Sequence, residues 1–191
     1  MKVAKQLPIT TYGMEVLRRK TKPVTVIDNK FIDLVQDMFY TMDMSFGVGL
    51  AAPQVNFEMS LAVIDISAIE EYKKEKPIVL INPIILESSG ESTREEGCLS
   101  IPEIRAAVMR PKNILLKYND FDLKDVEVEL SGFIARVVQH EIDHLNGKLF
   151  IDYLPAEKKK EIKKNLSGIK KGNVVTDYPL HINSKKESMK L

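Results

Sequence analysis

The sequence holds a single cysteine among 191 residues, and it has no tryptophan. One cysteine cannot form a disulfide within the chain, and a chain without disulfides suits a reducing compartment. No apolar run approaches the ~20 residues that a membrane-spanning helix needs. The N-terminal stretch MKVAKQLPITTYGMEV also lacks the apolar core of a signal peptide. We therefore expect a soluble, intracellular protein.

The sequence also lacks an excess of either charge. Lysine and arginine total 28 against 27 for aspartate and glutamate, which leaves a net charge of +1. So weak a field would not steer the protein onto nucleic acid or an anionic membrane, and we expect neither as a direct partner. Hydrophobic residues make up 44% of the chain, which is enough to bury the core of one domain.

Local patterns predict helices in the first and last parts of the domain and strands between them. Asp28 is suited to cap a helix whose apolar residues recur at three- and four-residue spacing up to about Ser45. Gly132 opens a second helical pattern, which Asn146 and Gly147 close in the usual position of a helix stop. Between them lie short stretches rich in β-branched residues: SLAVIDIS, PIVLINPIIL, NILLKYND and VEVEL. This order predicts an α+β fold with mixed or antiparallel strands.

Lysine dominates the chain after Pro155, beginning with AEKKKEIKK. We expect a C-terminal helix with few packing residues, which frays into a solvated tail rather than forming a nucleic-acid arm. The apolar residues of this region that could still dock on the domain are Val174, Val175, Tyr178 and Leu180. We therefore divide the chain into a folded domain at 1–166 and a lysine-rich C-terminal tail at 167–191.

Two of the three histidines lie in QHEIDHLNG, inside the second predicted helix. A helix turns about 100° per residue, so His140 and His144 project from the same side. Because Glu141 directly follows the first histidine, this is the HExxH pattern, in which both rings bind one metal ion and the carboxylate acts on its bound water. The pattern predicts a metal site with hydrolytic chemistry.

A catalytic site of this kind needs a third protein ligand and one open position. In the metalloprotease signature that continues to a third histidine, Phe150 stands at that place, and phenylalanine cannot bind a metal. Glu161 lies at a possible distance, but within KKKEIKK, which is typical of a solvated surface. Cys98, in EEGCLSIP, offers a thiolate where neither bulk nor a disulfide requires a cysteine. We favour Cys98 and leave Glu161 open.

Three segments carry a resemblance to a known family. GVGLAAPQ at 47–54, EEGCLSIP at 95–102 and QHEIDHLNG at 139–147 resemble the three signature motifs of peptide deformylase, in the family's order. With the looser YGMEVLR near the N-terminus, the resemblance extends from about residue 9 to residue 154. It implies an α+β fold in which the HExxH helix is central among the sheets, and a peptide deformylase-like catalytic domain at 1–166. It also implies an enzyme that hydrolyses a linear amide, removing the formyl group from the N-terminal formylmethionine of newly synthesised polypeptides and releasing formate.

The resemblance further implies a set of site residues. The metal ligands would be Cys98, His140 and His144. Glu141 is expected to take a proton from water and pass it to the departing amine. The Gln54 side-chain amide and the Leu99 backbone N–H would stabilise the oxygen that becomes anionic, and a glycine at position 49 would let the substrate backbone approach closely. The residues expected to bind substrate are Val48, Gly49, Phe133 and Val137.

The ligand set suits one divalent ion per chain, and Fe²⁺, Zn²⁺, Ni²⁺ and Co²⁺ are all compatible with it. The resemblance implies that the metal in cells is Fe²⁺, with the other ions as substitutes. It also implies that the partners are N-formylmethionyl nascent polypeptides, which the enzyme meets in passing at the ribosome, and that the protein lies in the bacterial cytosol. Two other classes stay open. One is a zincin-type peptidase that uses Glu161, and the other is a non-enzymatic protein whose closed metal site takes His181 as its fourth ligand.

Overall fold

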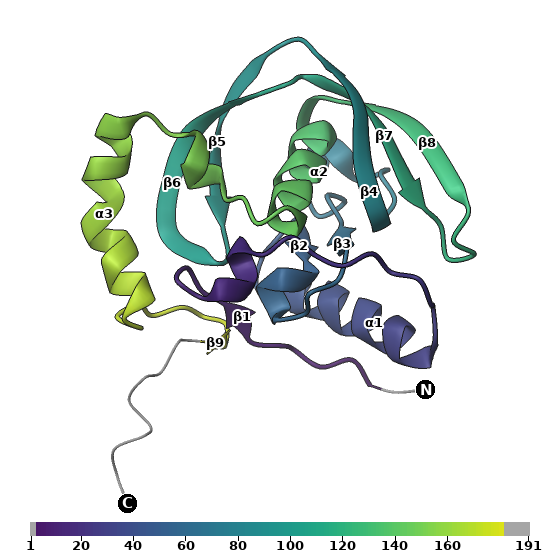
Figure 1. The fold of residues 1–191 in the computed structure, drawn as a ribbon, viewed down its shortest axis with the longest axis horizontal. Helices are drawn as coiled ribbons and strands as arrows, with labels where there is room; N and C mark the ends of the chain where they lie inside the picture. Colours follow the sequence, from purple (N-terminus) through teal and green to yellow (C-terminus); the bar gives the residue numbers. More distant parts are fainter. Residues whose placement is uncertain (1–2, 182–191) are drawn as a thin grey trace, which may run out of the picture.

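The computed structural model describes residues 3–181 and has an α+β fold (Figure 1). Its α-helices are α1 at Asn29–Met44, α2 at Gly132–Leu145 and α3 at Ala156–Lys170. Its 3-10 helices are η1 at Glu15–Arg18, η2 at Ala52–Val55, η3 at Glu70–Tyr72 and η4 at Phe150–Tyr153. None of the helices in this part of the chain is long and apolar enough to cross a bilayer.

The strands form three sheets, and the predicted mixture of helices with antiparallel strands is confirmed. The largest sheet has five antiparallel strands in the order β2 (Gly49–Ala51), β3 (Leu61–Ile64), β4 (Ile78–Ser89), β7 (Asn113–Asn119) and β8 (Asp125–Ser131). A long antiparallel hairpin joins β5 (Ser92–Cys98) to β6 (Ile101–Arg110). The third sheet is a short parallel pair, β1 (Ile9–Thr10) with β9 (Leu180–His181).

Helix α1 begins where the sequence predicts. The Asp28 side chain accepts a hydrogen bond of 2.9 Å from the backbone N–H of Phe31, which satisfies one of the free donors at the start of the helix. The apolar stripe of α1 is buried and packs on β2 and β3. The helix ends at Met44, and the following residues lead into β2, which starts at Gly49. This connection places the first motif at the edge of the five-stranded sheet.

Helix α2 carries the HExxH motif and follows β8 without a loop. Its buried side chains, which include Val138, Ile142 and Leu145, pack against apolar residues of the five-stranded sheet. The helix stops as predicted, with Asn146 at its C-cap and Gly147 beyond it at a φ of +70°. A side chain at position 147 would also collide with the Arg18 carbonyl, because an added Cβ would lie 2.6 Å from its oxygen. The orientation of the motif helix is therefore fixed by packing along its length and by a tight stop.

The C-terminal part of the described chain differs from the expected solvated tail. Helix α3 continues to Lys170, beyond the boundary placed at 166, and buries only Ile162 and Ile169. The chain then returns to the domain, where the Ile9 N–H donates to the Pro179 carbonyl at 2.8 Å beside the β1–β9 pair (Figure 1). Residues 182–191 of the predicted tail lie outside the described residues. That the catalytic domain ends at 166 stays a prediction.

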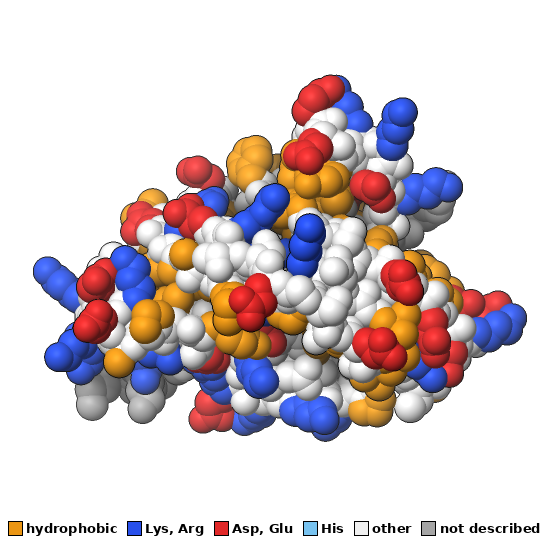
Figure 2. Space-filling model, turned by 90° about the horizontal axis from the view of Figure 1, so that it is seen from above, with side chains coloured by type: hydrophobic (Ala, Val, Ile, Leu, Met, Phe, Trp, Pro, Cys, Tyr) orange, Lys and Arg blue, Asp and Glu red, His pale blue; other side chains and the backbone are white. Residues whose placement is uncertain are grey.

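Charged side chains of both signs are interspersed over the face of the molecule seen in Figure 2. This distribution accords with the net charge of +1. On this face, surface charge offers no large region of one sign for a polyanion to bind.

Candidate metal centre

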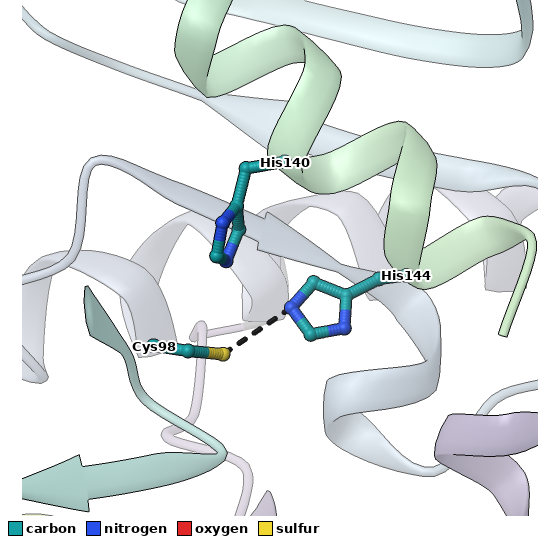
Figure 3. Close-up of side chains that lie close together, drawn as sticks. All are labelled: Cys98, His140 and His144. Atoms are coloured by element: carbon teal, nitrogen blue, oxygen red, sulfur yellow. Dashed lines mark hydrogen bonds between the residues drawn. The ribbon is translucent and has the colours of Figure 1, made fainter. Parts of the chain in front are cut away.

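Three side chains from two of the motifs converge in space. Cys98 lies at the end of β5, and His140 and His144 lie one turn apart on α2, so that all three point toward one another (Figure 3). The ligand atoms of the three residues all lie within 4.8 Å of one another, and the Cys98 Sγ is 3.2 Å from the His144 Nε2. A thiolate and two imidazoles at this spacing form a three-ligand set of the kind that binds a divalent ion in catalytic sites. The predicted triad is thus brought together.

The orientation of His140 is set by a buried carboxylate. The Glu96 Oε2 lies 3.0 Å from the His140 Nδ1, which leaves Nε2 as the ring nitrogen available to a metal. Burial alone would raise the pKa of Glu96, but hydrogen bonds from His140 and Arg110 outweigh it and lower that pKa to about 2. Glu96 is therefore ionised and holds the ring in one orientation.

Two buried arginines neutralise Glu96. Arg110 donates to it from Nε at 2.6 Å, Arg136 donates from Nη1, and both guanidinium groups are nearly inaccessible to solvent. Arg110 also donates to Asp143 at 2.7 Å, and the Tyr153 hydroxyl donates to the same aspartate at 2.8 Å. This network joins β5, β6, α2 and η4, so the strand that carries Cys98 and the helix that carries the histidines are held together by buried charges.

His144 is suited to bind a metal as a neutral imidazole. Burial, and then the positive charges of His140 and Arg110, lower the pKa of His144 well below its ordinary value. A neutral ring is the form that coordinates a metal ion. One thiol and two imidazoles are donors of the type that bind the divalent metal that the sequence predicts.

Glu141 is buried beside the three ligands and has an unusual environment. Its Oε2 has no hydrogen-bond partner among the described residues, and burial raises its pKa to about 7. Gly49 of β2 lies directly against it, because a Cβ at that position would be 2.4 Å from the Glu141 Oε1. A carboxyl group with a pKa near neutrality can both take up and release a proton at physiological pH.

The two predicted oxyanion donors also lie at the site. The Gln54 Oε1 accepts a hydrogen bond of 2.8 Å from the Ala51 N–H, which turns the amide nitrogen of Gln54 toward Cys98, at 3.5 Å from Sγ. Leu99 directly follows Cys98 in the turn between β5 and β6. Both residues line the same cleft as Cys98 and His140.

The cleft beside the three ligands has a volume of about 640 Å³. All four residues predicted to bind substrate line it: Val48, Gly49, Phe133 and Val137. The side chain of Phe133 is supported by stacking on Tyr72, with ring centroids 5.5 Å apart. The cleft is also lined by residues 175–178, which sequence analysis assigned to a tail.

The two residues that supported other classes of protein lie elsewhere. Glu161 projects from the exposed side of α3, where it pairs with Lys158 at 2.6 Å. His181 belongs to β9, next to Thr10 of β1. Within residues 3–181, neither joins the group of side chains whose ligand atoms converge with Cys98. Neither the zincin-type peptidase nor the closed structural site therefore gains support from the geometry.

Sequence reasoning missed Glu96, Arg110, Arg136 and Asp143. Glu96 and Asp143 stand inside the quoted motifs, two residues from Cys98 and one from His144, so their position was a usable signal. The two arginines carry no such signal, because their partners lie 14 to 40 residues away along the chain.

The chain was then compared with known proteins. A family model described as polypeptide deformylase matches residues 6–160. A peptide deformylase of Chlorobium phaeobacteroides is 49% identical over 174 residues, which cover 91% of this chain and 93% of the relative. The solved peptide deformylase of Legionella pneumophila is 39% identical with a TM-score of 0.79 and covers 88% of this chain and 97% of its own.

A third similar protein is known with a bound peptide. The class I type b peptide deformylase of Acinetobacter baumannii, solved with Met-Ala-Ser bound, is 36% identical with a TM-score of 0.74, covering 81% of this chain and 100% of its own. These similarities span the fold and all three motif segments. The chain belongs to the polypeptide deformylase family.

Proposed function

We propose that the protein is a metal-dependent hydrolase that removes the formyl group from the N-terminal formylmethionine of new polypeptides and releases formate. The observation that carries this proposal is the convergence of Cys98, His140 and His144 beside the buried carboxyl group of Glu141, whose Oε2 has no hydrogen-bond partner among the described residues. Membership of the polypeptide deformylase family supports the same reaction. In this proposal α2 is the central element of the fold, since it contacts β2, β3, β7 and β8.

Cys98, His140 and His144 would hold one divalent ion per chain, Fe²⁺ in cells, with Zn²⁺, Ni²⁺ or Co²⁺ as substitutes. When bound at such a site, the ion acts as a Lewis acid and lowers the pKa of a water toward neutrality. The role of the chain is to fix the ligand geometry. Glu96 serves this role by holding the His140 ring through Nδ1.

Glu141 is the general base and then the general acid. Its carboxylate takes a proton from the attacking water and delivers it to the amine nitrogen that leaves as the formyl C–N bond breaks. A pKa of about 7, caused by burial, suits both halves of this cycle. The close fit between Gly49 and Glu141 keeps the carboxyl group next to the cleft.

Gln54 and Leu99 stabilise the formyl oxygen as it becomes anionic. The hydrogen bond from the Ala51 N–H fixes the Gln54 amide before substrate arrives, so that no reorganisation is needed during the reaction. The backbone N–H of Leu99 is the second donor. Each such donor contributes ~2.7–4 kcal/mol to lowering the barrier.

The substrate backbone lies along the free edge of β2. This strand is at the end of the five-stranded sheet and, among residues 3–181, pairs only with β3, so its other edge can accept an added peptide strand. The methionine side chain lies against Val48, Phe133 and Val137, which line the cleft. The Met-Ala-Ser peptide bound to the Acinetobacter baumannii relative supports this kind of occupant.

The partners in cells are nascent chains that carry formylmethionine as they leave the ribosome, met in the cytoplasm of a bacterium. Similar peptide deformylases from bacteria such as Chlorobium phaeobacteroides support this setting. Near-neutral net charge supports the absence of a direct nucleic-acid or membrane partner.

The test is a paired assay under conditions that protect Fe²⁺ from oxygen. We expect rapid formate release from formyl-Met-Ala-Ser, with little hydrolysis of acetyl-Met-Ala-Ser and no cleavage of casein. Besides its oxygen and nitrogen, the formyl carbon carries only hydrogen, whereas an acetyl group adds a methyl at a position that we expect to be closed by Gln54 and Leu99. Exclusion by contact discriminates more strongly than a missing methylene, which is worth only ~1–3 kcal/mol. Equal rates on the formyl and acetyl peptides, or cleavage of casein, would overturn the proposal.

A further inference from the structure

The chain beyond α3 lies extended across the domain and reaches the cleft. Its residues alternate, with the even-numbered positions from 174 to 180 half-buried and the odd-numbered positions exposed. Val174 packs with the cluster formed by β6, η4 and α3, while Tyr178 and Leu180 pack with the cluster formed by α1, β2 and β3. This segment therefore connects two parts of the core, and Figure 1 shows it running from the end of α3 to β1.

Two hydrogen bonds, one from this segment and one from the residues after β1, hold the turn that follows Cys98. The Tyr178 hydroxyl donates to the Leu99 carbonyl at 2.9 Å. The backbone N–H of Tyr12, just after β1, donates to the Ser100 carbonyl at 2.8 Å. Because β1 pairs with β9, both donors belong to one local unit. The turn is thus anchored at two successive carbonyls by the two ends of the described chain.

The turn needs such an anchor. The register of the β5–β6 hairpin shifts between Gly97 and Cys98, so regular ladder pairing is interrupted next to the turn. Gly97 adds conformational freedom at that point. Leu99 also packs against the cluster formed by α1, β2 and β3, and the Tyr178 hydroxyl adds a directional contact to that packing. A displacement of about 1 Å at a catalytic group can lower a rate by as much as ~10²-fold.

We propose that Tyr178 is a positioning residue for the deformylation reaction and that residues 175–178 form the outer wall of the substrate cleft. The hydroxyl of Tyr178 fixes Leu99, so that the Cys98 thiolate and the Leu99 N–H keep their directions. The ring of Tyr178 and the exposed side chain of Val175 line the cleft, Val175 being 88% exposed at its mouth. Substrate residues beyond the methionine lie against this wall. The inference rests on the proposed function.

The test begins with Tyr178→Phe, which removes only the hydroxyl. We expect kcat for formyl-Met-Ala-Ser to fall about 3–10-fold, the effect of one hydrogen bond, with KM nearly unchanged. Metal content should stay at the wild-type value, and the melting temperature should fall by no more than about 2–6 °C, the effect of one hydrogen bond. Amide hydrogen exchange in the peptide that covers residues 98–101 should become faster, because the anchor of that turn is lost.

Tyr40→Phe is the matched control. Tyr40 lies on α1, is 41% exposed and is not among the residues that line the cleft. Its variant should match wild type in kcat, KM and hydrogen exchange. Tyr178→Ala removes the ring as well, and should add at least a threefold rise in KM for the tripeptide to the fall in kcat.

The outcomes separate this inference from the function on which it rests. If wild type releases no formate from the formyl peptide, the proposed function fails. If wild type is active and Tyr178→Phe has the same kcat and the same exchange at residues 98–101, only the role of Tyr178 is overturned. The role of Tyr178 would also be overturned if kcat falls only because less of the Tyr178→Phe variant is folded. In that case the difference in kcat would vanish at a temperature where wild type and variant are both fully folded.

Discussion

The two sides of the cleft are held in place by different forces. The side that carries Cys98 and His140 is fastened by Glu96 between Arg110 and Arg136, whose side chains are only 4–5% exposed. The outer wall, residues 175–178, is fastened by the hydrogen bond from Tyr178 to Leu99 and, just beyond it, by a two-residue parallel strand pair. Removing one partner of a buried charge network costs about 3–5 kcal/mol, whereas one hydrogen bond contributes about 0.5–1.5 kcal/mol. The metal-binding residues thus lie on the more strongly fastened, rigid side. The outer boundary of the substrate site, residues 175–178, lies on the side that a single substitution displaces more easily.

The largest effect is expected from Glu141→Gln on the rigid side. The amide has nearly the same shape as the carboxyl group but cannot accept the proton, so turnover should fall by a factor of ~10²–10⁴. Metal content and the melting temperature should be retained. Steady-state formate release, measured beside metal analysis of the same sample, is the check. Near-normal turnover would show that the reaction needs no base at this position.

Glu96→Gln should weaken the rigid side itself. The change removes the carboxylate that pairs with Arg136 and leaves Arg110 with Asp143 alone, and we expect a loss of about 3–5 kcal/mol in the free energy of unfolding. Urea unfolding measures this loss. The matched control is Glu95→Gln, since the Glu95 side chain is 65% exposed and lies 3.8 Å from Arg105; its effect should stay within about 0.5 kcal/mol. Equal stability of the two variants would contradict the network's role.

Gly49→Ala should disturb the site with little change in the fold. The new Cβ would lie 2.4 Å from the Glu141 Oε1, so the carboxyl group must move, and turnover should fall by roughly 10²-fold. The control is Gly168→Ala in α3, where an added Cβ meets nothing closer than 3.7 Å. That variant should keep full activity and gain about 0.5–1 kcal/mol of stability. Wild-type turnover in Gly49→Ala would show that the position of Glu141 tolerates this displacement.

The smallest effect concerns Asp152, an exposed carboxylate that contrasts with Glu96. Partial burial would raise the pKa of Asp152, but hydrogen bonds from Arg18 and the Leu149 N–H lower it below its ordinary value. Because the pKa of Asp152 is lower in the folded than in the unfolded protein, its ionised carboxylate stabilises the fold at pH values above the unfolded pKa of ~3.9. This stabilisation is lost as the pH falls through the folded-state pKa. Asp152→Asn should therefore cost at most about 1 kcal/mol at pH 7. Urea titrations at decreasing pH should show this difference shrinking, and a growing difference would contradict the assignment.

Local signals predicted much of the fold and the core of the site. Asp28 caps α1 and Gly147 stops α2 because such preferences depend on a few neighbouring residues. His140 and His144 share one helix face for the same reason. Cys98 required a second argument, since its place opposite the helix depends on the β5–β6 hairpin.

Contacts between distant parts of the chain could not be predicted in this way. Tyr178 meets Leu99 across 79 residues, and Arg136 meets Glu96 across 40. The lysine content of α3 favoured a solvated tail, yet residues 172–184 contain no lysine. The alternation of Val174, Thr176 and Tyr178 was the signal of an extended, half-buried segment. It was too short to outweigh the charge run before it.

The central claim is that Cys98, His140 and His144 bind one metal ion, and the most direct measurement is metal content per chain after purification without oxygen. Wild type should hold close to one equivalent, Cys98→Ser should lose most of it, and Glu161→Ala, whose residue lies on the exposed side of α3, should retain it. Full metal occupancy in Cys98→Ser together with loss of metal in Glu161→Ala would contradict the claim and favour a zincin-type peptidase that uses Glu161.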